Sequence, residues 1–180
     1  ESLPRERFGD LPRRRPEDHV FAALGPIVDG QLDAVEARGL GSLDSVAGTD
    51  RRLLEHGYLF QAYNRFAAAF DALIETQRRR GDEPAEVPFA DELLGVLRER
   101  GFGRPERERY IALFYQLRRA YFFIARSLVG DSPSMKRLRR ELWNNVFTSD
   151  LLAYGDQLWN RMEDFSTLLL GETGTGKGTA

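Results

Sequence analysis

The last ten residues of the chain have the types and spacing of a phosphate-binding loop. The stretch reads Gly171-Glu172-Thr173-Gly174-Thr175-Gly176-Lys177-Gly178-Thr179. Its glycines allow the backbone to turn N–H groups around an anion, and Lys177 adds a cation for the outer phosphates. The pattern Gly-x-x-x-x-Gly-Lys is met, but Gly178 occupies the position at which a Ser or Thr hydroxyl normally holds Mg²⁺. We therefore expect this loop to bind the phosphates of a nucleotide.

The residues around this loop support a nucleotide site. Leu168, Leu169 and Leu170 precede it as a short apolar run, which is typical of a central parallel strand covered on both faces. Lys136 and Lys177 are the only two lysines, and a chain that otherwise uses arginine has lysine where a slim ammonium group must reach phosphate. The alternative interpretation is a flexible Gly/Thr-rich tail. We favour the phosphate loop.

The composition is that of a globular protein able to form a core, since 42% of the 180 residues are hydrophobic. A net charge of −2 gives no overall electrostatic reason to expect binding to nucleic acid or to a membrane. The absence of cysteine excludes disulfides and thiolate metal sites, and it fits the reducing cytoplasm. No apolar stretch is long enough to span a bilayer, and the N-terminus lacks the apolar part of a signal peptide. We therefore expect a cytoplasmic protein.

Most of the chain has the apolar periodicity of α-helices. Residues 1–16 are rich in proline and arginine and are expected to be a flexible lead-in. Helices are predicted at 18–38, 50–80, 89–100 and 105–127, where apolar residues recur at steps of three and four. The second of these carries the broadest aromatic face, which we expect in the core rather than around a ligand. Gly25-Pro26 predicts a kink in the first helix. Residues 17–127 are thus predicted to form one helical bundle.

The chain changes character at Leu128. Gly130 and Pro133 end the long helix, and Ser132 or Ser134 can cap the next one. That helix has apolar residues on one side and a basic cluster on the other, which we interpret as a solvated surface; the cluster is Lys136, Arg137, Arg139 and Arg140. A further helix at 149–162 leads to the apolar run and the phosphate loop.

Two segments of this second part carry a family resemblance. Leu128-Val-Gly-Asp-Ser-Pro-Ser-Met135 and Thr167-Leu-Leu-Leu-Gly-Glu-Thr-Gly-Thr-Gly-Lys177 together resemble the opening of the AAA+ domain of bacterial enhancer-binding proteins. These are the ATP-driven activators of sigma-54 RNA polymerase. The residue after the lysine is commonly Glu in that family and is Gly178 here, and the stretch 144–163 is longer than the usual spacer, which suggests an added helix. The resemblance covers residues 128–180, whereas the preceding helical part resembles no sensor domain that we identify.

The resemblance implies an ATPase that forms a ring, hexameric in the full-length chain, and uses ATP with Mg²⁺ to remodel the closed promoter complex of sigma-54 RNA polymerase. In such a domain, residues 171–179 would wrap the phosphates, Lys177 would neutralise the β and γ oxygens, and Val129 and Gly130 would lie against adenine. Promoter DNA would be bound only through regions beyond this sequence. The expected fold class is mainly α, with a helical regulatory domain at 17–127 followed at 128–180 by the truncated N-terminal part of an α/β AAA+ P-loop domain.

The sequence begins without methionine and stops inside the helix expected after the phosphate loop, so we interpret it as a fragment of a longer chain. A Walker-B acid, an arginine finger and a sigma-contacting loop cannot be assigned in it. The parent chain is expected to be an ATPase, but residues 1–180 alone are expected to show no useful turnover and at most weak phosphate affinity.

The other candidate residues predict less chemistry. His19 and His56 lie far apart without metal-ligand spacing, and Asp91-Glu92 and Glu163-Asp164 have the positions of solubility and capping groups. Two other functions stay open. One is an AAA+ remodelling ATPase with no role in transcription, and the other is a helical binding module that works without nucleotide. The signal sensed by the bundle, and whether the bundle activates or represses the ring, do not follow from the sequence.

Overall fold

The structure is a computed structural model that describes residues 16–81 and 83–146. In chain order its elements are α1 (Pro16–Glu36), the short 3-10 helix η2 (Leu43–Ser45), α2 (Gly48–Arg80), α3 (Ala90–Glu99), α4 (Arg104–Ser127) and α5 (Pro133–Val146). No strand occurs among the described residues. The predicted helical class is confirmed for this part of the chain. Residues 1–15 of the predicted lead-in at 1–16, the helix predicted at 149–162, the apolar run at 168–170 and the predicted phosphate loop lie outside it.

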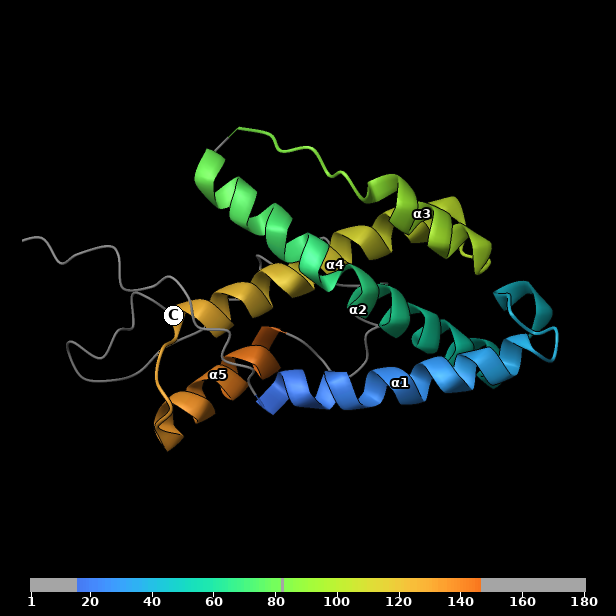
Figure 1. Cartoon of the computed structure of the whole chain (residues 1–180), viewed down its shortest axis with the longest axis horizontal. Coiled ribbons are helices and arrows are strands. Elements are labelled where there is room, and N and C mark those ends of the chain that lie inside the picture. The colour runs from blue at the N-terminus through green and yellow to red at the C-terminus, as the bar shows by residue number, and fades with distance from the viewer. Residues whose placement is uncertain (1–15, 82, 147–180) are drawn as a thin grey trace, which may run out of the picture.

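The long helices α2 and α4 cross at the centre of the bundle (Figure 1). α1 packs along α2 on one side, and α3 packs against both α2 and α4 on another. The last described helix, α5, packs on α4 and lies beyond the N-terminal end of α1 (Figure 1). The bundle is thus built around α2 and α4.

The aromatic face predicted on residues 50–80 forms the core of the bundle. Phe66 and Phe70 are buried, and both rings lie against Phe89, which immediately precedes α3. Tyr63 packs edge-on against the fully buried Phe114 of α4, with ring centroids 5.6 Å apart. Removing one such side chain from water stabilises the fold by about 2 kcal/mol. The expectation that this face packs in the core is confirmed for Phe66 and Phe70.

The end of α3 is a glycine-dependent turn that joins distant parts of the chain. The N–H of Gly101 donates to Arg98 O at 3.0 Å, and that of Phe102 donates to Leu97 O at 3.1 Å. This pair of bonds is the Schellman motif, in which the residue after the helix takes a positive φ. Gly101 has φ +91°, and a Cβ there would lie 2.7 Å from Ser42 Oγ. The turn therefore holds the η2 segment against the end of α3.

The first helix differs from its prediction in its end point and in what its apolar face meets. α1 passes through Pro26 without a break, and it ends at Glu36 rather than near residue 38. Leu24 and Ile27, which share the apolar periodicity of the predicted core face, are 41% and 61% exposed. The helical spacing was correct, but this part of α1 faces an open groove instead of the core.

Candidate functional site

The structure describes two of the predicted nucleotide-site residues, Val129 and Gly130, because residues 171–179 lie outside the described part of the chain. Both residues lie in the turn between α4 and α5. Leu128 is buried at the start of this turn, whereas the Val129 side chain is 60% exposed. Gly130 has φ +130°, and a Cβ there would lie 3.2 Å from the Met135 side chain. The turn therefore offers an apolar side chain to solvent beside a backbone segment that favours glycine.

Arg139 holds this turn in place. Its Nη1 donates hydrogen bonds to the carbonyl oxygens of Leu128 and Gly130, both at 2.8 Å. The sequence analysis placed Arg139 on a solvated basic surface. This is wrong, because the side chain extends back to the turn that precedes α5 and bonds to its backbone. Lys136, Arg137 and Arg140 are exposed as predicted. At the start of α5, the Ser132 hydroxyl accepts a hydrogen bond from the Met135 N–H at 3.2 Å, so Ser132 is the cap.

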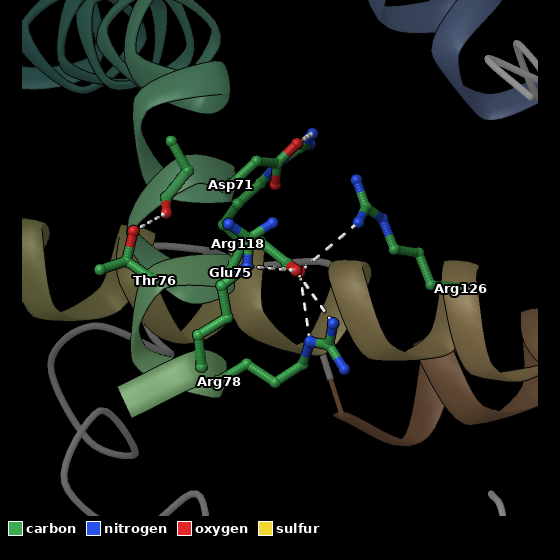
Figure 2. Close-up of polar contacts among 8 residues, drawn as sticks. Asp71, Glu75, Thr76, Arg78, Arg118 and Arg126 are labelled. Atoms are coloured by element: carbon green, nitrogen blue, oxygen red, sulfur yellow. Dashed lines mark hydrogen bonds and ion pairs between the residues drawn. The ribbon is translucent and has the colours of Figure 1, made fainter. Parts of the chain in front are cut away.

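Arg118 of α4 and Asp71 of α2 form a paired contact between the two central helices (Figure 2). Arg118 Nε and Nη2 donate to the two carboxylate oxygens at 2.7 and 2.6 Å. Burial disfavours the charge on Arg118, but the hydrogen bonds and charge of Asp71 outweigh this effect and raise the pKa of the guanidinium further. The same guanidinium lies 4.6 Å from the ring centre of Tyr121. The pair thus fixes the register of α4 on α2.

Glu75 forms ion pairs with three arginines near the ends of the same two helices (Figure 2). Arg78 and Arg79 lie one turn further along α2, at 2.9 and 3.2 Å, and Arg126 in the last turn of α4 lies at 3.8 Å. Hydrogen bonding from Arg78 lowers the pKa of Glu75. The Arg126 guanidinium also lies 4.2 Å from the ring centre of Phe122. Glu75 therefore connects the end of α2 to the point at which α4 enters the turn.

The charged groups around Asp71 and Glu75 have the properties of contacts that stabilise the fold. Arginine stays protonated in proteins, and a carboxylate whose pKa is lowered is a poor proton carrier near neutral pH. The hydroxyl of Tyr110 donates to Glu55 Oε1 at 2.8 Å, and burial, followed by this hydrogen bond, raises its pKa well above the ordinary value. His56 lies at the surface with Nδ1 2.7 Å from Arg52 O. Within the described ranges, no three His, Cys, Asp or Glu side chains meet in a metal-binding cluster.

A groove of about 860 Å³ opens between α1 and α2, with α4 beneath it and α5 at one end. Its floor consists of buried side chains, namely Leu32, Leu54, Leu59, Phe114 and Leu117. The exposed side chains Leu24, Ile27 and Leu53 also line it. Because α1 and α2 run in opposite directions, Arg38 and Asp50 lie at one end of the groove, and Trp143 lies at the other. The sequence did not predict this groove, because residues facing a groove and residues facing a core have the same helical spacing.

Comparison with protein-family models, curated proteins and solved structures finds no match to this chain. Among the helices that the structure describes, none combines the length and the apolar character needed to cross a lipid bilayer.

Proposed function

We propose that the chain is the N-terminal portion of an ATP-dependent, sigma-54-interacting transcriptional regulator. In this proposal, the helical bundle is the regulatory domain of an AAA+ ATPase, and the turn after α4 is the first part of the nucleotide site. ATP hydrolysis by a ring of such chains remodels the closed promoter complex.

The turn at residues 128–130 is the observation that carries this proposal. An adenine ring needs an apolar surface and a close approach to the backbone, and an exposed Val129 beside Gly130 has both properties. Arg139 fixes this turn through two backbone carbonyls, so that it is formed before any ligand arrives. In this proposal, the Gly-x-x-x-x-Gly-Lys pattern later in the same chain binds the phosphates of the nucleotide.

The turn also follows directly from the bundle, which supports a regulatory role for the bundle. α4 runs from the core of the bundle to Ser127, and its last turn is connected to α2 through Arg126 and Glu75. A change in the packing of α2 against α4 would therefore move the first residues of the nucleotide site. Coupling of this kind needs an element with two arrangements, and the contact between Arg126 and Glu75 is weak enough to break in one of them.

In the proposed reaction, the protein positions the phosphates and stabilises their charge. The glycine-rich loop at 171–179 would supply N–H groups to the phosphates, and Lys177 would neutralise charge on the β and γ oxygens. Mg²⁺, when bound, would supply further positive charge to the phosphates. Val129 and Gly130 would hold the base and so set the direction of the phosphate chain.

The test uses ATP hydrolysis by the full-length parent protein. Replacement of Lys177 by Ala is expected to lower the rate by about a hundredfold or more, because a cation at the transferring phosphate is lost. Lys136→Ala is the matched control, since Lys136 is exposed on α5 and is the other lysine of this chain. Equal activity of the native protein and Lys177→Ala would rule out the phosphate role of the loop.

A second candidate function, a helical binding module that works without nucleotide, is favoured by the groove between α1 and α2. It predicts that the chain binds its partner equally well with and without ATP. An AAA+ remodelling ATPase outside transcription is distinguished in another way, because it would hydrolyse ATP without opening a sigma-54 promoter.

A further inference from the structure

We propose that the groove between α1 and α2 is a binding site for an uncharged, straight-chain amphiphile. The aliphatic chain lies on the apolar floor and points towards Trp143, and the polar head lies between Arg38 and Asp50. This site needs no ATPase activity, so it stands or fails separately from the proposed function.

The apolar part of the groove suits an aliphatic chain. Its volume of about 860 Å³ lies within the usual range of small-molecule sites, roughly 300–1,000 Å³. Leu59 and Phe114 are fully buried at the floor, whereas Leu53 is 73% exposed at the margin. Exposed leucine and isoleucine side chains along one groove leave apolar area in water, and a ligand chain would remove that area from water.

The two ends of the groove differ in polarity, and this difference sets the direction of the ligand. Arg38 and Asp50 line the same end, and neither forms an ion pair within the described part of the chain. A carboxylate head would be attracted by Arg38 and repelled by Asp50. An ammonium head would be attracted by Asp50 and repelled by Arg38. A hydroxyl or amide head can accept a hydrogen bond from Arg38 and donate one to Asp50. Charge complementarity therefore favours an uncharged head.

Trp143 provides a signal for occupancy. Its ring packs edge-on against Tyr121, with centroids 5.9 Å apart, and it lines the apolar end of the groove. The chain has two tryptophans, so the Trp159→Phe variant of residues 1–180 leaves Trp143 as the single reporter. Titration with dodecanol is expected to give a saturable blue shift of its fluorescence, because the indole loses contact with water.

Substitutions at the margin of the groove test where the probe binds. Ile27→Gln and Leu53→Gln, made in the Trp159→Phe chain, change exposed side chains and are expected to leave the helical circular dichroism and the unfolding midpoint unchanged. Each is expected to weaken dodecanol binding by about tenfold, since apolar contact with the chain is lost. Val87→Gln is the matched control, because Val87 is an exposed apolar side chain that does not line the groove. Binding that is unaffected by both groove variants would overturn the proposal.

The head group is tested by comparing dodecanol, dodecanoate and dodecylammonium. The chain with native Arg38 and Asp50 is expected to bind dodecanol most tightly of the three probes. The Asp50→Asn variant is expected to gain affinity for dodecanoate, and the Arg38→Gln variant is expected to gain affinity for dodecylammonium, because each loses the charge that repels that head group. A preference of the unsubstituted groove for either charged probe, or the absence of saturable binding, would overturn the proposal. Sedimentation of the same variants completes the test, because a native dimer that Ile27→Gln dissociates would assign the groove to a second copy of the chain.

Discussion

At the scale of single residues, the fold depends on a few positions. Each of them needs either one particular backbone conformation or one particular charged partner. Gly101 takes a left-handed conformation against Ser42 and Leu43, and Arg118 makes two short hydrogen bonds to Asp71. The sequence indicated the first of these, since glycine stands at positions 101 and 103, directly after the helix predicted at 89–100, and glycine is common at such ends. The second could not be foreseen, because the two partners lie 47 positions apart in the chain.

Gly101→Ala is expected to lower the free energy of unfolding by about 1–3 kcal/mol, because alanine is strained at this φ and its Cβ would meet the η2 segment. Gly95→Ala is the matched control. Gly95 lies within α3, and a Cβ added there would meet no other atom within 4 Å, so alanine is expected to stabilise the fold by about 0.5–1 kcal/mol. Urea unfolding of both variants measures the difference, and equal stabilities would contradict the described turn.

A double-mutant cycle with Arg118→Ala and Asp71→Ala is expected to give a coupling energy of about 1–2 kcal/mol, because the pair is bidentate and largely buried. The exposed pair Arg104 and Glu108, with side chains 83% and 60% exposed, is the comparison and should give about 0.5 kcal/mol or less. A coupling at Arg118 no larger than that of the exposed pair would argue against its role in fixing α4 on α2.

At the scale of helices, periodicity predicted where each helix lies but not what covers each face. The aromatic face of α2 was correctly placed in the core because it is broad and continuous over several turns. Leu24 and Ile27 share the apolar spacing of the first helix but line the groove, because the spacing of a single helix does not specify its neighbours. Arg139 was missed for a related reason. A long side chain can return to its own preceding turn, and only the geometry of that turn shows this.

The pairing of Glu75 with Arg78 and Arg79 at the end of α2 predicts a dependence of stability on pH. The pKa of Glu75 lies below the ordinary value of 4.5 in the folded protein, chiefly through Arg78. The stabilisation is therefore fully present above that ordinary value and is lost as the pH falls through the lower, folded value. Relative to Glu75→Gln, the native chain is expected to lose stability on acidification from neutral pH to about pH 3.

Chemical denaturation of the two proteins at both pH values measures this effect. Glu99→Gln serves as the control, since Glu99 is an exposed carboxylate of α3 outside the arginine cluster. If the stability gap between the native chain and Glu75→Gln were the same at both pH values, the carboxylate would not be the group that holds these arginines.

At the scale of the whole molecule, the sequence predicted the helical bundle because its apolar periods are long and are ended by glycine, proline and capping residues. For the proposed nucleotide site, the two groups of expected contacts stand differently. Its phosphate contacts were predicted from a local motif, which needs no knowledge of tertiary packing, and they lie outside the described residues. Its expected adenine contacts, Val129 and Gly130, lie in a turn whose fixed shape depends on Arg139. The groove arises from the packing of several helices and could not be predicted from any one of them.

The most direct test of the proposed function is the opening of a sigma-54 promoter by the full-length parent protein in the presence of ATP. We predict that the native chain and Lys136→Ala open the promoter and that Lys177→Ala does not, because the phosphate loop has lost its cation. Hydrolysis of ATP without promoter opening would contradict the transcriptional role, and opening by Lys177→Ala would contradict the nucleotide site itself.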